Sequence, residues 1–450
     1  MYEENFEELK KQCSNSKIFY HKININSPIL PFITDSRNQT HFDNGFDSIM
    51  GEFARISSKK SLNKDFSITN VSNDILLDNI QIEEDIEDYL KIIINEYLLK
   101  DNNLKILHPF LFLYIEKTEG TRSNNETEIA RFIRDVFFKD IENFKDLFNN
   151  EEIHNVAVKL ILENIQELPE KITRPKYISC LPFVIDIFRE DLEFIKENTG
   201  FLLSNINEIF AFYYFYYCSQ LILKLNQHFD KVDLNNPSII YSLLDWEKAS
   251  QSRKSINGGY NILKEANKSL FVNMNLLEQV NILAGTNGLF ICQINELINN
   301  NKINKQDFMA ILKEWIKYYD NVHSLEKYVD YNNLEDLIYL LKSELQSAIK
   351  NQQKTSFTFN LNNIGKKYFL KRRGQYGYAL NITKDFLYLI TALCVKEDKI
   401  KLNDLFKEYE RRGLFFDRHS KEEIVNLLNT WNLIDKKSDS GDAQYVKQIL

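Results

Sequence analysis

The last part of the chain, residues 381–450, changes its apolar period, and this change constrains the fold more than any other feature. Up to residue 431 the apolar residues recur at intervals of three and four, the spacing of one helix face. Beyond it they alternate with polar residues, the period of a strand. Three helices followed by two strands are therefore predicted. The three apolar stripes are Phe386, Leu387, Ile390 and Leu393; Leu402, Leu405, Phe406 and Tyr409; and Ile424, Leu427, Leu428 and Trp431.

Local signals support these boundaries. Gly413 suits the residue just after the second helix, where a positive φ is common. Ser420 and Glu423 have the spacing of a capping box at the start of the third helix. The two strands, 433–437 and 444–450, are joined by a loop rich in turn formers, which predicts a hairpin.

Three helices with a terminal hairpin are typical of a winged helix-turn-helix domain, here predicted over residues 381–450. DNA is the commonest partner of such a domain, and a protein-binding winged helix is the alternative. On this fold Lys421 opens the third helix, where residues that read the major groove would lie. Lys436 and Lys437 lie at the base of the hairpin. Asp439 and Asp442 at its tip repel phosphate, so a role in the turn or in partner contact is favoured there.

Charge is distributed unevenly along the chain. The whole protein carries a formal net charge of −8, so it is not a basic nucleic-acid coat. Residues 361–450, however, hold 17 Lys and Arg against 12 Asp and Glu, a local balance of +5 that leaves −13 for residues 1–360. This asymmetry directs a basic C-terminal region toward an anionic partner.

The fold class is predicted as mainly α: a multi-helix body with a small β-hairpin element and a C-terminal winged helix-turn-helix domain. Residues 1–70 are polar and irregular and predict an N-terminal arm or docking segment, and residues 71–355 predict the helical body. The expected helices are Tyr2–Cys13 and Gly45–Ile56, followed by 86–99, 126–138, 153–165, 205–225, 276–299 and 334–349. The apolar run 209–223 is shorter than the roughly 20 residues of a membrane span, so it predicts a buried core helix.

Residues 356–380 predict a small basic β-element. Ser356–Leu361 alternates strictly, and Lys366–Lys371 and Gln375–Leu380 read as two further strands around an Arg-Arg-Gly turn. Cations interleaved with tyrosines and a phenylalanine can hold phosphates and stack on bases, whereas a solvated hairpin over a core is the alternative. The candidates for nucleic-acid binding are Lys366, Lys367, Lys371, Arg372, Arg373, Lys421, Lys436 and Lys437.

Motifs for catalysis are not found. The sequence has no GxxxxGK[ST] loop, no HExxH and no GxSxG. Glu397-Asp398-Lys399 has the letters of a nuclease motif but falls in a predicted turn. We therefore expect no catalytic residue, no metal and no cofactor. The five scattered cysteines, without CxxC, and the acidic N-terminus predict a reduced cytoplasmic protein.

Three stretches are similar to one known family. The most specific similarity covers Arg412–Ser420 and Asn432–Val446, and weaker ones cover Asp245–Arg253 and Leu30–Phe32. Together these strings resemble the DptG family, the middle subunit of three-protein DNA phosphorothioation-dependent restriction systems. The residues that carry the C-terminal resemblance include Arg412, Gly413, Asp417, Ser438, Asp439, Ser440, Gly441 and Asp442.

The resemblance implies a role in bacterial antiphage defence. In such systems modification proteins place sulfur in the backbone of host DNA, and a separate complex attacks DNA that lacks the mark. The resemblance implies ATPase-type partner subunits, DptF-like and DptH-like, that carry the motor or nuclease chemistry. It implies a non-catalytic subunit that bridges these partners and contacts DNA, with no membrane association.

Two other hypotheses remain open. A stand-alone winged-helix DNA-binding regulator would bind a palindrome as a symmetric dimer. A cryptic metal-dependent nuclease would cleave DNA with Mg²⁺ or Mn²⁺ as the purified chain, and a carboxylate substitution would abolish that cleavage.

Overall fold

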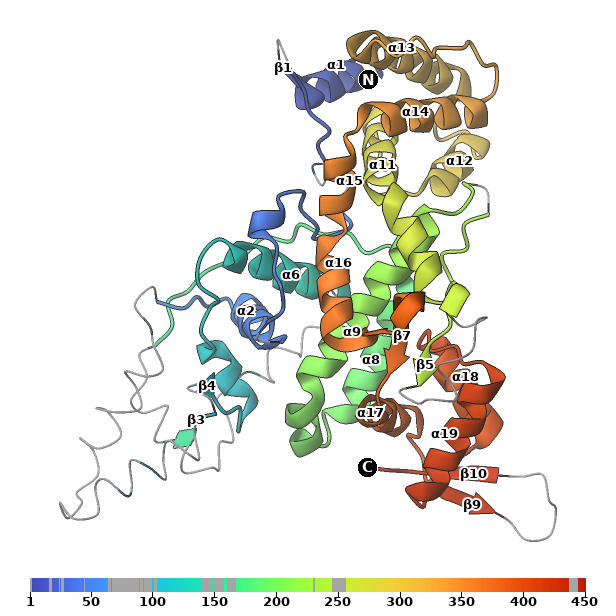
Figure 1. The fold of residues 1–450 in the computed structure, drawn as a ribbon. Helices are drawn as coiled ribbons and strands as arrows, with labels where there is room; N and C mark the ends of the chain where they lie inside the picture. Colours follow the sequence, from blue (N-terminus) through green and yellow to red (C-terminus); the bar gives the residue numbers. More distant parts are fainter. Residues whose placement is uncertain are drawn as a thin grey trace. The chain divides into compact units, whose positions relative to one another are not determined.

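The computed structural model is mainly helical in the part of the chain that it describes (Figure 1), as the apolar periodicity predicts. It describes residues 2–63, 103–139, 167–244, 256–436 and 444–450, apart from a few single positions before residue 45 and residue 230, together with isolated positions in the gaps. The chain folds as two compact units: residues 42–176 with 195–211, and residues 1–41, 177–194 and 212–450.

The smaller unit is built around helix α2 (Asp47–Ser57), which packs against α6 (Arg122–Phe137) and the short 3-10 helix Pro109–Tyr114. The ring of Phe53 lies 4.8 Å from that of Phe138 and 5.2 Å from that of Phe210. These aromatic contacts bury large apolar surfaces, which is the main stabilising term in a small core.

The core of this unit also holds a charged pair. Arg55 is buried, and its guanidinium lies 2.7 Å from the Glu52 carboxylate. The same guanidinium donates to the carbonyls of Leu113 and Ile115 at 2.9 and 2.7 Å. A buried cation is tolerated only with such partners, so this pair ties α2 to the 3-10 helix. The strands β3 (Leu99–Lys100) and β4 (Asn103–Leu104) form a two-residue antiparallel pair.

Helix α11 is the centre of the larger unit. It contacts α1, α12, α13, α14, α15 and β7, and Figure 1 shows it enclosed between α12, α14 and α15. The helices of this unit are α1 (Tyr2–Cys13), α8 (Pro182–Ile195), α9 (Thr199–Leu225), α11 (Tyr260–Ala284), α12 (Ile291–Asn299), α13 (Lys305–His323), α14 (Leu334–Ala348), α15 (Asn351–Phe357), α16 (Phe359–Ile364), α17 (Lys384–Cys394), α18 (Leu402–Arg411) and α19 (Arg418–Thr430). Helix α9 begins in the smaller unit.

Residues 209–225 of α9 are buried on every face, which confirms the predicted core helix. Tyr213 and Tyr217 of this helix have hydrogen-bond partners, as buried hydroxyls require. Tyr213 donates to the Asp191 carboxylate, and the hydroxyl of Tyr217 accepts from the backbone N–H of Cys180 at 2.7 Å. Among the described residues no helix is both long enough and apolar enough to cross a membrane.

Two small sheets lie in the C-terminal half. Strands β5 (Leu243–Leu244), β7 (Tyr378–Ile382) and β6 (Leu370–Arg372) form one sheet in the order β5-β7-β6. Strands β8 (Lys399–Lys401), β10 (Gln444–Lys447) and β9 (Ile434–Lys436) form the other, in the order β8-β10-β9 with antiparallel pairing throughout. The remaining short strands, β1 (Ser14–Asn15) and β2 (Ile18–Phe19), follow α1 as an antiparallel pair.

Most of the predicted helices are confirmed. Helices α1, α2, α6, α9 and α14 match their predicted segments to within a few residues at either end, as do α17, α18 and α19 at the C-terminus. The hairpin of the C-terminal region is confirmed by the pairing of β9 with β10. The predicted extended segment around Leu30 and Phe32 is buried without regular structure. The predicted helices 86–99 and 153–165 fall almost entirely outside the described residues.

Two predictions are wrong. Ser356–Leu361 forms the end of α15 and the first half of α16, not a strand, because Phe357, Leu361 and Ile364 also have helical spacing and all three are buried. The segment 276–299 is two helices, since Gly285 adopts φ +67° and ends α11.

Three predicted boundaries also differ from those in the structure. Lys366–Phe369 lies within a π-helical turn (Gly365–Phe369), so only residues 370–372 form the predicted strand. Residues 374–376 form a 3-10 turn before β7. Lys399, placed by the sequence in a turn, begins strand β8.

Candidate nucleic-acid interface

The hairpin of β6 and β7 presents its cations outward. Leu370 pairs with Leu380, and Arg372 pairs with Tyr378. Leu370 is buried, whereas Lys371 and Arg372 are exposed. Strand β6 is the edge of its sheet, and charged side chains on an edge strand oppose pairing with another chain. These cations are therefore accessible to an anionic ligand.

Two more candidate cations lie on the π-helical turn just before β6. Lys366 and Lys367 are exposed there, while Phe369 is buried. The ring of Phe369 lies 4.9 Å from that of Phe215 on α9 and 5.7 Å from that of Phe386 on α17. This aromatic anchor fixes the turn, so the two lysines are carried on a rigid support.

The structure brings the turn and the hairpin together around one tyrosine. The ammonium of Lys366 lies 5.5 Å from the ring centroid of Tyr378, within the range of a cation–π contact. Arg372 is the cross-strand partner of the same tyrosine. Lys366, Arg372 and Tyr378 are thus neighbours on the hairpin.

Arg373 differs from the other candidates. Its guanidinium donates to the side-chain oxygen of Asn381 at 2.6 Å and to the carbonyl of Leu244 at 3.3 Å. These bonds join β5 to β7 and the hairpin tip. Arg373 therefore also joins elements of the fold, and its predicted role in phosphate binding stays a prediction.

Helix α19 begins three residues earlier than the sequence predicted. Its N-cap is Asp417, whose carboxylate accepts from the backbone N–H of Ser420 at 2.8 Å. Ser420 is buried and does not form the predicted capping box. Asp417 accepts a hydrogen bond from a backbone N–H of the first turn that has no partner within the helix. Asp417 therefore marks the start of α19 in the sequence.

Because α19 begins earlier than predicted, its first turn carries other cations than Lys421. Lys421 lies one turn inside α19, 3.0 Å from the Glu410 carboxylate and 5.1 Å from the ring centroid of Phe406. The first turn instead exposes Arg418 and His419, whose side chains are 88% and 70% accessible. Sequence reasoning missed both, and the N-cap signal of Asp417 would have found them.

The C-terminal sheet carries a second set of missed lysines. Lys399 and Lys401 are exposed on β8, and Lys447 is exposed on β10 directly opposite Lys399. Like charges directly opposite one another destabilise a ladder. The Asp435 carboxylate, 3.5 Å from the Lys399 ammonium, offsets part of this repulsion. The alternation Lys399-Ile400-Lys401 is the signal that predicts this face.

Part of the predicted set of residues lies outside the described part of the chain. Lys436 ends strand β9. Lys437 and the loop residues Ser438, Asp439, Ser440, Gly441 and Asp442 lie outside the described residues, as does the segment Asp245–Arg253. The predicted roles of these residues remain predictions.

Arg412 from the DptG-like string is fully buried and holds an ionic cluster. Its guanidinium lies 2.6 Å from one oxygen of Asp191 on α8 and 2.9 Å from the other, and 2.7 Å from the Glu408 carboxylate. The Lys396 ammonium lies 3.2 Å from Asp191, and Tyr213 donates to the same carboxylate. Arg412 thus fastens α18 onto α8 and α9.

Gly413, the next residue, is held against α9. Its φ is +76°, and an added Cβ would lie 2.0 Å from a ring carbon of Tyr216. Only glycine meets both the conformational and the spatial requirement there. Arg412, Gly413 and Asp417 therefore all have structural roles in this fold, and a further role of the string stays a prediction.

Burial shifts the titration of groups in this ionic cluster. Burial raises the pKa of the Cys394 thiol to about 12. Burial and the nearby Asp191 carboxylate raise the pKa of Tyr213 well above its ordinary value. Burial opposes ionisation of Glu408, but Arg412 and then Arg411 lower the pKa of its carboxyl. The tyrosine and the thiol stay neutral at pH 7, which suits a packed structural cluster.

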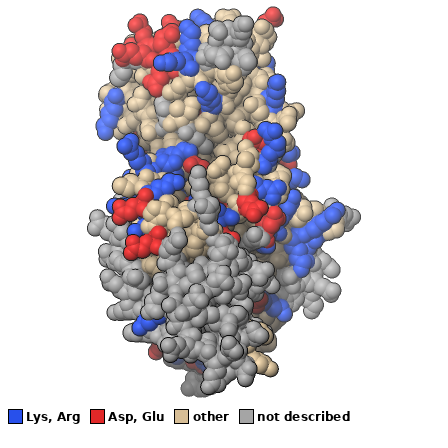
Figure 2. Space-filling view, turned by 90° about the vertical axis from the view of Figure 1, so that its left-hand side faces the viewer, with Lys and Arg blue, Asp and Glu red and all other residues tan. Residues whose placement is uncertain are grey.

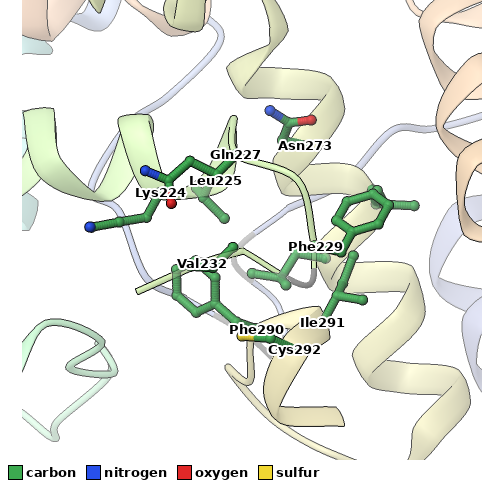
Figure 3. Close-up of a pocket in the computed structure, with 11 residues that line it drawn as sticks. Lys224, Leu225, Gln227, Phe229, Val232, Asn273, Phe290, Ile291 and Cys292 are labelled. Carbon is green, nitrogen blue, oxygen red and sulfur yellow. The ribbon is translucent and has the colours of Figure 1, made fainter. Parts of the chain in front are cut away.

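A pocket near the end of α9 is too small for a cofactor. Figure 3 shows its mostly apolar lining, with Lys224, Gln227 and Asn273 as polar groups. The Lys224 ammonium donates to the carbonyl of Asn236 at 2.7 Å. The space accommodates about one water molecule. Within the described residues there is also no cluster of three or more His, Cys, Asp or Glu that could hold a metal ion.

Charge is mixed on part of the described surface. Figure 2 shows basic and acidic side chains interspersed over one face of the described residues. A duplex-binding surface neutralises successive phosphates with Lys and Arg, so the basic hairpin and sheet are better candidates than this mixed surface.

Comparison with known proteins reveals one distant similarity. The chain is 22% identical over 396 residues to autophagy-related protein 11 of the yeast Vanderwaltozyma polyspora. The similarity covers 85% of this chain but only 27% of the yeast protein. No family model matches the chain. An identity this low over a helical chain does not show the family.

Proposed function

We propose that this protein is a non-catalytic subunit of a cytoplasmic bacterial DNA phosphorothioation-dependent restriction complex, and that it contacts DNA directly. The observation that carries DNA contact is the set of exposed cations on the β6–β7 hairpin and the C-terminal sheet. The assignment to a restriction complex rests on the DptG-like strings of the sequence.

The order of elements in the C-terminal region supports a winged helix-turn-helix domain there. The elements follow in the order α17, β8, α18, α19, β9 and β10, and β10 lies between β8 and β9 in the sheet. Helix α18 contacts α17, β8 and β10. In this proposal α19 is the recognition helix, and its exposed Arg418 and His419 face the DNA.

The roles proposed for the C-terminal region and for the rest of the chain follow from their net charges. The C-terminal region has a local balance of +5, and the rest of the chain has −13. Phosphate contacts then belong to the hairpin and the winged helix. The helical remainder provides surfaces for the ATPase-type DptF-like and DptH-like subunits.

The test of DNA contact is the salt dependence of binding. Fluorescence anisotropy with a labelled duplex measures affinity at several salt concentrations for the wild type and for Lys371→Ala/Arg372→Ala. We expect the double variant to bind more weakly on every sequence and its salt slope to fall by about two, since about one counterion is released per phosphate contact. Lys10→Ala/Lys11→Ala, which removes two lysines from α1, should leave the slope unchanged.

The test of the complex is co-purification. A tagged chain isolated from its native host at moderate salt should carry ATPase subunits at a fixed ratio, identified by mass spectrometry. A chain that is recovered as a symmetric dimer bound to a palindromic site, without such subunits, would instead establish the stand-alone regulator.

A further inference from the structure

The tip of the β6–β7 hairpin projects an aromatic side chain. Strand β6 ends at Arg372 and β7 begins at Tyr378. Between them, Gly374 and Gly377 have φ values of +52° and +77°, and an added Cβ on either would meet no atom within 4 Å. Tyr376 lies between these glycines and is 42% exposed. The tip is therefore open to solvent around the tyrosine.

The base of the tip is rigid. The backbone N–H of Arg373 donates to the carbonyl of Gly377 at 2.6 Å, and that of Tyr376 donates to the carbonyl of Arg373 at 3.0 Å. The Arg373 side chain fixes the tip to Asn381. A rigid support means that little conformational freedom is lost when the tyrosine meets a ligand.

Cations line the hairpin directly behind the tip. Lys371 and Arg372 are exposed on β6, and Lys366 lies over the ring of Tyr378. Exposed cations together with an exposed aromatic ring are a combination that binds single-stranded nucleic acid, because cations hold the backbone while the ring stacks on a base.

We propose that Tyr376 stacks on an unpaired base of DNA whose backbone phosphates lie against Lys371 and Arg372. In an intact duplex the base faces are already stacked, and separating a base step costs a few kcal/mol. The hairpin tip therefore selects DNA with unpaired nucleotides, such as a fork or a junction. This inference rests on the proposed DNA contact and specifies the form of DNA that the hairpin binds.

The experiment compares three labelled DNAs by fluorescence anisotropy with the full chain: a blunt duplex, the same duplex with unpaired arms, and the single strand. The wild type should prefer the forked and single-stranded DNAs. Tyr376→Ala should weaken binding to both about tenfold, the effect of losing one base–aromatic stack, and leave duplex binding unchanged. Tyr376→Trp should retain the preference.

A matched tyrosine provides the control. Tyr20 is 41% exposed and also has a lysine over its ring, with the Lys22 ammonium 5.7 Å from the centroid. Tyr20→Ala should leave binding to all three DNAs unchanged. Lys371→Ala/Arg372→Ala should weaken binding to all three, because phosphates are common to them.

The outcomes separate this inference from the function on which it rests. Duplex binding that depends on the cations, with Tyr376→Ala binding forked DNA as tightly as the wild type, overturns the stacking role alone. No measurable binding to any of the three DNAs overturns DNA contact itself. Loss of co-purifying subunits in Tyr376→Ala with unchanged DNA affinities assigns the tip to a protein partner and likewise overturns stacking.

Discussion

The tripeptide Arg-Arg-Gly occurs twice in this chain, at Arg372–Gly374 and at Arg411–Gly413. The two have the same local design. In each, the first arginine is exposed, the second forms hydrogen bonds within the fold, and the glycine has a positive φ, +52° or +76°. The local sequence therefore places a glycine with positive φ at both turns, one in a β-hairpin tip and the other after helix α18.

Their surroundings differ. Arg373 meets a neutral amide and a carbonyl, and Gly374 lies in open space. Arg412 is fully buried against two carboxylates, and Gly413 is in contact with Tyr216. The same tripeptide can therefore form a solvent-exposed hairpin tip or a buried helix end, depending on which distant residues pack against it.

The largest expected difference is between the two second arginines. Arg412→Met leaves the Asp191 carboxylate buried with reduced compensation, which costs about 3–5 kcal/mol of stability. Arg373→Met removes hydrogen bonds to neutral acceptors and costs about 1 kcal/mol. Urea unfolding followed by circular dichroism measures both. The double variant Arg412→Met/Asp191→Leu should regain part of the loss. Equal costs for the two single variants would contradict the larger contribution that we assign to the buried Arg412.

The two glycines should differ next. Gly413→Ala adds a clash with Tyr216 to the strain of a positive φ and should cost about 2–4 kcal/mol. Gly374→Ala adds only the strain, about 1 kcal/mol. Thermal unfolding measures both. Tyr216→Ala makes its own cavity, but in its background Gly413→Ala should cost no more than Gly374→Ala. If Gly413→Ala still costs more than Gly374→Ala in the Tyr216→Ala background, the extra cost does not come from contact with Tyr216.

The pH dependence of stability should differ on a smaller scale. Arg412 and Arg411 hold the pKa of Glu408 below its ordinary value of 4.5, against the effect of burial. The stability contributed by this ion pair is thus present above pH 4.5 and lost as the pH falls through the lowered pKa. Glu408→Gln should cost about 1 kcal/mol at pH 7 and progressively less below pH 4.5. The partners of Arg373 are neutral, so the stability cost of Arg373→Met in unfolding titrations should not change with pH in this range.

The smallest effects are expected for the two first arginines. Arg411 forms exposed ion pairs with Glu190 and Glu408, so Arg411→Ala should cost about 0.5 kcal/mol of stability and leave DNA binding unchanged. Arg372→Ala should leave stability unchanged and lower the salt slope of DNA binding by about one. Anisotropy titrations at several salt concentrations decide this, and an equal loss of slope in Arg411→Ala would extend the DNA surface to α18.

Much of the fold could be predicted because helix signals are local. The stripe of Leu402, Leu405 and Tyr409 needs only its own spacing to specify α18. The strand predicted at Ser356–Leu361 failed because its residues satisfy both periods. Contacts from distant elements decided between the two periods: the Phe357 ring lies 5.1 Å from that of Phe271 on α11.

The candidate site was predictable to a similar degree. Exposure of Lys371 follows from strand alternation beside the buried Leu370, whereas Arg372 is exposed although alternation places it on the same face as Leu370. Asp417 is a capping residue before a helical stripe, but the sequence also contains a capping-box pattern at Ser420, which predicts a later helix start. Arg418 and His419 were missed for that reason.

The sequence alone determined the helices, the glycine turns and the basic character of the C-terminal region, since these depend on neighbours a few residues away. Only the tertiary structure decided which cations face solvent. Arg412 finds Asp191 at a separation of 221 residues, and Arg373 finds the Leu244 carbonyl at a separation of 129. Burying a guanidinium requires compensating partners, and partners this distant are brought into contact only by the packing of the whole unit.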